Sequence, residues 1–259
     1  MTGSLRSRQR RRIKGMPITI PSLKELLQSG AHFGQKTSRW HPKAKPFLFG
    51  SAKGVHIINL EKTREQLAQA AEFALNLSRR GGTILFVGTK RQARGVIEAA
   101  ATKAGMPHIT GRWMGGLFTN FNTMLDLLRK LERLEADKAA GKFAQYTKRE
   151  QLDVERDIAR LHGTIGGIKD VRRLPDAVFI ADVTVDKIAV GESTRKGIPI
   201  IAIVDSNANP EPIAYPIPAN DDAVKSVELI SNVIADAILE GKKLTPAPAT
   251  APAPEPQAA

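Results

Sequence analysis

Basic and aromatic side chains are interleaved through residues 26–60, a stretch that contains no acidic residue. Cations neutralise phosphate groups and flat rings stack on unpaired bases, so this mixture predicts contact with RNA. A basic loop that only kept the protein in solution would have no need of a tryptophan. The residues expected to make the contact are Lys36, Arg39, Trp40, His41, Lys43 and Lys45.

Zinc bound by His32 and His41 is the alternative for the same stretch. None of the five histidines has a ligand-pair spacing such as His-x-x-x-His. We therefore expect no metal and no cofactor.

Glycines and a lysine at a predicted strand-to-helix turn, residues 82–90, suggest a phosphate-binding loop. The spacing is wrong, because such a loop has four residues between its glycines, whereas five separate Gly82 from Gly88. The predicted helix begins with three cations, which oppose the helix dipole unless a bound phosphodiester offsets them. Lys90, Arg91 and Arg94 are therefore expected to contact phosphate, and the alternative is a solvated helix face.

A third cluster, residues 111–122, combines three glycines with polar and aromatic side chains. Glycine permits close approach of the backbone to a ligand. Arg112, Trp113 and Asn120 offer charge, a stacking surface and a neutral hydrogen-bonding group, so we expect them to contact RNA. The alternative is a hinge in which Trp113 and Phe118 pack inward, and both readings can hold together.

Two aspartates, Asp182 and Asp205, each end a predicted strand, where acids of α/β enzymes often hold magnesium or act as bases. The competing interpretation is that each one caps the turn that follows it. Without a phosphate loop or a partner histidine, capping is favoured and no catalysis is expected. An enzyme acting on a phosphorylated metabolite, with Lys90 and Arg91 on the phosphate, is the alternative function.

The net positive charge of the chain lies in its first half. Residues 1–125 contain 21 Lys and Arg against 5 Asp and Glu, and residues 126–259 contain 18 against 21. Such segregation predicts one surface that binds a polyanion.

Short apolar runs alternate with helical patterns over most of the chain. This alternation predicts a doubly wound, mainly parallel α/β sheet of the Rossmann or flavodoxin type. The predicted strands are residues 55–59, 83–87, 177–181 and 199–204, and the predicted helices are residues 23–28, 61–78, 90–104, 187–196 and 221–239. A capping box formed by Ser22 and Glu25 marks the start of the first helix.

Residues 119–165 interrupt this alternation with helical patterns alone. Their apolar positions form a narrow stripe, and a Thr147–Glu150 capping box marks a restart after a turn. We expect an inserted antiparallel coiled-coil hairpin that stands away from the sheet and buries its stripe between its own two arms.

The remaining organisation follows from composition. Residues 16–118 and 166–241 are expected to form one α/β domain, between a basic disordered arm (residues 1–15) and a disordered Pro/Ala tail (residues 242–259). No apolar run reaches the roughly 18 residues that span a bilayer, so we expect no membrane partner. The absence of cysteine fits a reducing compartment such as the cytoplasm. The Arg-rich arm leaves an organelle transit segment as the alternative.

Six blocks in order along the chain resemble the bacterial small-subunit ribosomal protein two family. They are AHFGQKTSRWHPKAKPFLFG, ILFVGTKRQA, GRWMGGLFTNFNT, LPDAVFIADV, AVGESTRKGIPIIAIVDSNANP and YPIPANDDAVKSVELI, within residues 18 to about 241. The resemblance implies an α/β domain with a projecting hairpin, no catalysis, and a seat between the head and body of the small subunit. It also implies contacts with small-subunit ribosomal RNA and neighbouring ribosomal proteins, including the messenger-binding protein one.

Overall fold

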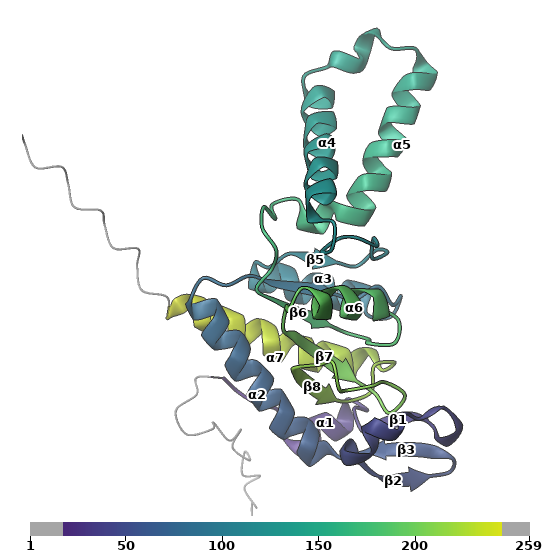
Figure 1. The fold of residues 1–259 in the computed structure, drawn as a ribbon, viewed down its shortest axis with the longest axis vertical. Helices are drawn as coiled ribbons and strands as arrows, with labels where there is room; N and C mark the ends of the chain where they lie inside the picture. The colour runs from purple at the N-terminus through teal and green to yellow at the C-terminus, as the bar shows by residue number, and fades with distance from the viewer. Residues whose placement is uncertain (1–17, 245–259) are drawn as a thin grey trace, which may run out of the picture.

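The computed structural model describes residues 18–244, so the predicted arm and almost all of the predicted tail lie outside the described residues. A five-stranded parallel sheet forms the centre of the fold, with the strand order β5-β4-β6-β7-β8 (Figure 1). Counted along the chain within this sheet, the order is 2-1-3-4-5, the flavodoxin-like arrangement. The strands are β4 (Ile84–Val87), β5 (His108–Ile109), β6 (Ala177–Ile180), β7 (Ile200–Val204) and β8 (Tyr215–Pro218).

Helices cover both faces of this sheet, as the alternating pattern predicted. Because successive strand residues point to opposite faces, Phe86 and Phe179 lie in one apolar core and Val87 and Ile180 lie in the other. The first core contains α2 (Leu60–Arg79), α3 (Arg94–Ala104) and α7 (Val224–Lys243), and the second contains α6 (Lys187–Arg195). The α/β class is therefore confirmed.

A second sheet, which the sequence did not predict, is formed by strands within residues 33–58, near the amino-terminal end of the described chain. Its three strands are antiparallel in the order β1-β3-β2, whereas residues 55–59 were expected to join a parallel sheet. The short helix α1 (Leu23–Gln28), with its predicted Ser22–Glu25 capping box, precedes it. The strands are β1 (Phe33–Lys36), β2 (Leu48–Ala52) and β3 (Val55–Ile58), and the 3-10 turns η1 (Thr37–Arg39) and η2 (Pro42–Phe47) lie between β1 and β2.

Strand β8 was also missed, because its sequence, Tyr-Pro-Ile-Pro, contains two prolines that cannot donate ladder hydrogen bonds. The strand is tolerated because it pairs only with β7, at the edge of the sheet. Helix α3 begins at Arg94 and not at Lys90, so Lys90 and Arg91 lie in the turn before it.

Two antiparallel helices project from the domain between β5 and β6 (Figure 1). They are α4 (Phe121–Ala139) and α5 (Lys148–Ile165), joined by η3 (Lys142–Gln145), and the Thr147–Glu150 capping box is present. Coiled-coil packing between them stays a prediction.

The root of this hairpin belongs to the core of the domain. Leu128, Leu131, Leu161 and Ile165 are buried in the same apolar cluster as Val87 of the parallel sheet. The expectation that the stripe would be consumed between the two arms is therefore wrong for the root of the hairpin. Long helices that leave a domain still need their first turns anchored, and here the second face of the sheet provides the anchor.

Candidate nucleic-acid interface

The loop formed by residues 34–47 is attached to the carboxyl end of β7. The backbone N–H of His41 donates to the carbonyl of Ser206 (2.8 Å), and the N–H of Gln35 donates to the Ser206 hydroxyl (2.8 Å). Gly34 is required beside them, because a Cβ at this position would lie 2.8 Å from Oγ of Ser206. The basic aromatic loop is thereby positioned at the edge of the parallel sheet where the strands end.

The cations of this loop are exposed. Lys36, Arg39 and Lys45 form no ion pair with a carboxylate in residues 18–244, and Lys43 pairs only with the exposed Glu211. Cations without such partners keep their full charge available to a polyanion.

The two predicted ring contacts of the loop differ in their surroundings. Trp40 is 37% exposed, and its ring lies 5.3 Å from that of His56, so one part of the indole is supported while another part faces solvent. Nδ1 of His41 accepts the backbone N–H of Lys43 (3.2 Å) and so caps η2. Trp40 is therefore suited to stack on a base, and His41 has a structural role in shaping the loop.

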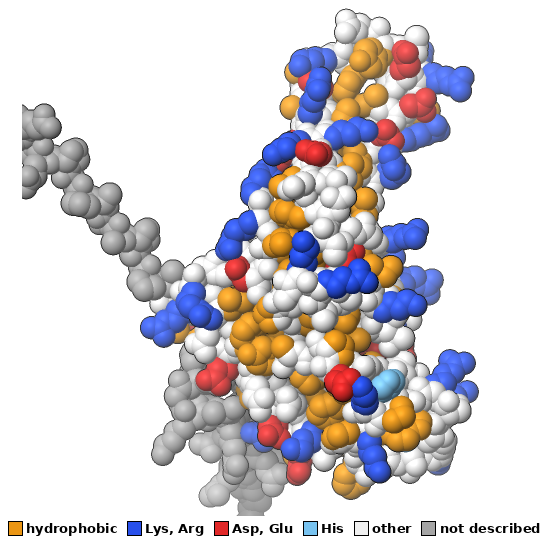
Figure 2. Space-filling model, in the orientation of Figure 1, with side chains coloured by type: hydrophobic (Ala, Val, Ile, Leu, Met, Phe, Trp, Pro, Cys, Tyr) orange, Lys and Arg blue, Asp and Glu red, His pale blue; other side chains and the backbone are white. Residues whose placement is uncertain are grey.

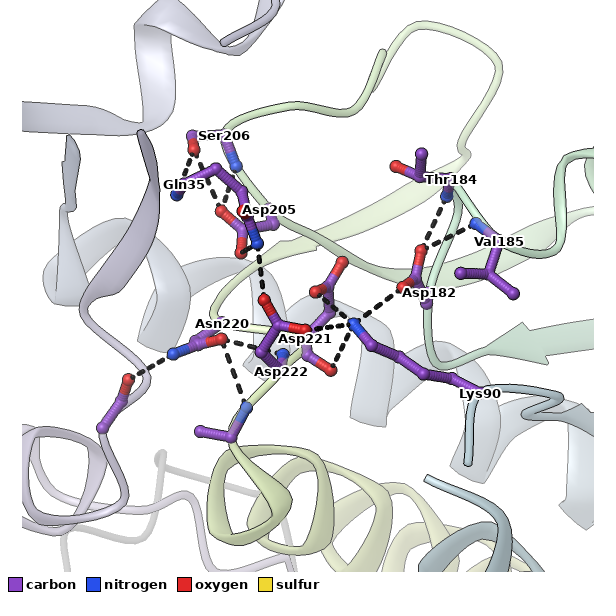
Figure 3. A network of polar contacts seen from close by, with 12 residues as sticks. Gln35, Lys90, Asp182, Thr184, Val185, Asp205, Ser206, Asn220, Asp221 and Asp222 are labelled. Carbon is purple, nitrogen blue, oxygen red and sulfur yellow. Dashed lines mark hydrogen bonds and ion pairs between the residues drawn. The ribbon is translucent and has the colours of Figure 1, made fainter. Parts of the chain in front are cut away.

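Lys90 lies at the centre of an ion-pair network and is largely enclosed (Figure 3). Its ammonium is 2.9 Å from Oδ2 of Asp182, 2.8 Å from Oδ1 of Asp221 and 2.7 Å from Oδ1 of Asp222. These carboxylates follow β6 and β8, so the network lies at the strand ends, where doubly wound folds bind ligands. Lys90 was expected to contact phosphate, but its charge is already used inside the protein.

The network also ties the two sheets together. The side-chain amide of Gln35 donates to Oδ2 of Asp222 (2.7 Å) and to Oδ2 of Asp205 (3.4 Å). Residues after β4, β7 and β8 thus meet the start of the basic aromatic loop at one edge of the parallel sheet.

The protonation states in this network follow from its charge balance. Three carboxylates around one ammonium leave an excess of negative charge, so the ammonium is held charged while one carboxyl is favoured to take up a proton. Burial by itself lowers the pKa of Lys90, but the hydrogen bonds that its ammonium donates to Asp221, Asp222 and Asp182 outweigh burial and raise it. Burial, together with the charge of Asp182, raises the pKa of Asp221 to about 7.

A pH dependence of stability follows from Asp221. Because its pKa is raised from 3.8 in the unfolded chain to about 7 in the folded one, its contribution to stability is full below pH 3.8 and is lost as the pH rises through about 7. The variant Asp221→Asn cannot titrate there. We expect its free energy of unfolding, relative to that of the wild type, to rise between pH 5 and pH 8 in urea titrations. A difference that stays constant across this range would contradict the assignment.

Asp182 and Asp205 act as caps, as favoured from the sequence. Oδ1 of Asp182 accepts the backbone N–H groups of Thr184 (2.8 Å) and Val185 (2.9 Å), and Oδ1 of Asp205 accepts the N–H and hydroxyl of Ser206. The alternative enzyme placed Lys90 and Arg91 on a phosphate and Asp182 or Asp205 on magnesium. Lys90 and both aspartates are committed to contacts within the protein, and within residues 18–244 no three His, Asp or Glu side chains are grouped to hold a metal.

Arg91 and Arg94 remain exposed beside this network. Nε of Arg94 donates to the carbonyl of Thr89 (3.0 Å), which directs the side chain along the turn, and neither arginine forms an ion pair within the described part of the chain. They follow β4, and so lie at the same edge of the sheet as the basic aromatic loop.

The cluster at residues 111–122 follows β5, the strand at the far end of this edge. Arg112 and Asn120 are exposed, but Trp113 is only 5% exposed and packs edge-on against Phe118, with ring centres 5.0 Å apart. The inward-packing alternative is correct for Trp113 in this structure, and stacking on a base is not available to it.

One residue that sequence analysis missed, Glu192 of α6, organises this cluster. Its buried carboxylate accepts backbone N–H groups from Gly116 (2.7 Å), Phe118 (2.8 Å) and Thr119 (3.1 Å). Its position among the buried residues of an amphipathic helix, next to Ser193, was the available signal. A glutamate on the buried face of a helix normally has a compensating partner.

The exposed predicted residues therefore share one edge of the domain, at the ends of β4, β5 and β7. Figure 2 shows Lys and Arg side chains on both margins of the domain and on the projecting hairpin. Many of the hairpin cations are paired with acids, such as Arg129 with Asp126 and Lys138 with Glu155. The predicted cations other than Lys43 and Lys90 form no ion pair within residues 18–244, so their charge is available to a polyanion.

The fold is therefore a doubly wound α/β domain whose own ion-pair network lies at the strand ends, where such folds bind ligands. The chain belongs to the ribosomal protein S2 family, since the family model described as Ribosomal protein S2 matches residues 26–241. Proteins of this family are rRNA-binding structural constituents of the small ribosomal subunit and take part in translation. Within residues 18–244, no helix is both long and apolar enough to cross a membrane.

Proposed function

We propose that this chain binds small-subunit ribosomal RNA through the edge of the parallel sheet where its strands end. The contact surface consists of Lys36, Arg39, Trp40, Lys43, Lys45, Arg91, Arg94, Arg112 and Asn120. The observation that carries the proposal is the contrast between these exposed side chains and Lys90, whose charge is neutralised inside the domain. His41 and Trp113 support the surface from within, and the role is structural, in the cytoplasmic ribosome.

The salt dependence of RNA binding tests this proposal. Each cation that neutralises a phosphate contributes about 0.7 to 0.9 to the slope of log K against log salt concentration. Replacing Lys36, Arg39, Lys43 and Lys45 by Gln is therefore expected to reduce the slope by about 3 and to weaken binding at physiological salt by more than tenfold. Filter binding to small-subunit RNA over a range of salt concentrations measures both quantities.

A control with the same change in net charge separates contact from general attraction. The exposed cations Arg79, Arg80, Lys103 and Lys243 lie at the carboxyl ends of α2, α3 and α7, and their replacement by Gln should change the slope by less than about 1. Equal losses in the two quadruple variants would reject the proposed surface.

We also propose that the chain contacts neighbouring small-subunit proteins, including protein one, through a different surface. An open apolar groove of about 400 Å³ lies between α1 and β2, and its wall includes Leu23, Leu27 and Phe49, the last of which is 80% exposed. Exposed apolar grooves of this kind support protein contacts.

Two substitutions in this groove test the protein contact separately. Leu27→Ser combined with Phe49→Ser is expected to weaken binding of purified protein one by at least tenfold, because apolar area is lost from the contact. The salt dependence of RNA binding should stay as in the wild type. Unchanged affinity for protein one in pull-down titrations would reject this surface.

A further inference from the structure

We propose that Glu192 is a positioning residue for RNA binding, which holds the loop at residues 113–119 so that Arg112 and Asn120 on its two sides face the RNA. The inference rests on the RNA contact proposed above for this loop. It adds a residue that itself lies below the surface.

The contacts of Glu192 are concentrated on one short segment. Oε1 accepts the N–H of Gly116 (2.7 Å), and Oε2 accepts the N–H groups of Phe118 (2.8 Å) and Thr119 (3.1 Å). Three backbone groups within four residues therefore converge on one carboxylate. Gly116 has a φ of +92°, a backbone conformation that favours glycine and that lets the segment turn around the carboxylate.

This carboxylate is compensated by backbone donors and not by a cation. Glu192 is 3% exposed, and no Lys or Arg of residues 18–244 forms an ion pair with it. Burial by itself raises the pKa of Glu192, but the hydrogen bonds from Gly116, Phe118 and Thr119 outweigh burial and lower it. The side chain is thus ionised at neutral pH, and charge-assisted hydrogen bonds hold the loop.

The groups next to this anchor are left available on the surface. Arg112 is exposed and has no carboxylate partner among the described residues. Asn120 stands at the N-cap of α4, yet its side chain does not cap the helix. An asparagine at an N-cap normally uses its side-chain oxygen for this purpose, whereas the amide of Asn120 makes no capping hydrogen bond within residues 18–244 and can bind RNA.

Glu192 also connects this loop to the parallel sheet. Glu192 lies on α6, which packs against the second face of the sheet. The loop that it holds lies just before α4 of the projecting hairpin. Fixing the loop before RNA binds reduces the ordering cost of association. Loss of the carboxylate should therefore weaken the same contact that Arg112 makes.

A double-mutant cycle on binding to small-subunit RNA tests the inference. Arg112→Gln is expected to reduce the salt slope by about 0.7 to 0.9. Glu192→Gln should weaken RNA binding to a similar extent as Arg112→Gln. The double variant should bind RNA no more weakly than the weaker of the two single variants, because both substitutions act on one contact. The losses of binding free energy caused by Glu192→Gln and Lys36→Gln should add, since the two substitutions affect separate parts of the surface.

The outcomes distinguish the inference from the proposed function. A folded Glu192→Gln protein with wild-type affinity and slope, or losses that add with those of Arg112→Gln, would overturn the positioning role alone. No effect of Arg112→Gln would remove the RNA contact of the loop, and the positioning role with it. If Glu192→Gln does not fold, amide exchange in the free wild-type protein decides: Gly116, Phe118 and Thr119 should already be protected, and protection that arises only on RNA binding would overturn the inference.

Discussion

Replacing Lys90 by Ala is expected to reduce the free energy of unfolding at neutral pH by about 3 to 5 kcal/mol, because three carboxylates would face one another without their ammonium. Asp182 and Asp221 are buried, so water cannot replace the lost partner fully. Urea unfolding at pH 7.5 measures the loss. The variant should recover part of it near pH 5, where carboxyls of raised pKa become protonated.

Lys103→Ala provides the matched control for this prediction. Lys103 pairs with Asp236, but both side chains are about half exposed, so the pair should contribute no more than about 1 kcal/mol. If Lys90→Ala were no more destabilising than Lys103→Ala, the buried network would contribute no more to stability than an exposed ion pair.

Replacing Gly167 by Ala is expected to loosen the projecting hairpin from the domain. A Cβ at this position would lie 2.3 Å from the backbone carbonyl oxygen of His108 in β5, so the backbone must move. Such overpacking costs about 1 to 3 kcal/mol or more. Thermal unfolding should show this loss, and amides at the ends of α4 and α5 nearest the domain should exchange faster.

A second glycine at the same root gives the opposite expectation. A Cβ at Gly163, within α5, would meet no atom within 4 Å, so Gly163→Ala should be neutral or stabilise the protein by up to about 1 kcal/mol through helix propensity. Equal effects of the two substitutions would show that close backbone packing does not anchor the hairpin.

Local signals in the sequence predicted the main architecture. Apolar strands such as Ile84–Val87 and the two capping boxes, at Ser22 and Thr147, are short-range features, and the structure has them where expected. Strands β1 and β2 of the second sheet were missed because they are short and partly or largely exposed, so they lack the apolar runs that indicated β3 and the parallel strands.

The candidate site was only partly predictable, because the partners of its charged residues are distant in sequence. The carboxylates of Asp182 and Asp221 are 92 and 131 residues from Lys90, and Glu192 is 76 residues from Gly116. A count of charges identifies a cation but not whether it is neutralised in the folded protein. That difference separates Lys90 from Arg91, its neighbour in the chain.

Ultraviolet cross-linking of the protein within small ribosomal subunits, followed by mass spectrometry of the RNA-linked peptides, tests the central claim most directly. The account predicts that cross-linked nucleotides are found in the peptides of residues 36–45, with Trp40 among the modified residues, and near Arg91 and Arg112. Cross-links confined to the carboxyl ends of α2 and α7, or none in residues 36–45, would contradict it.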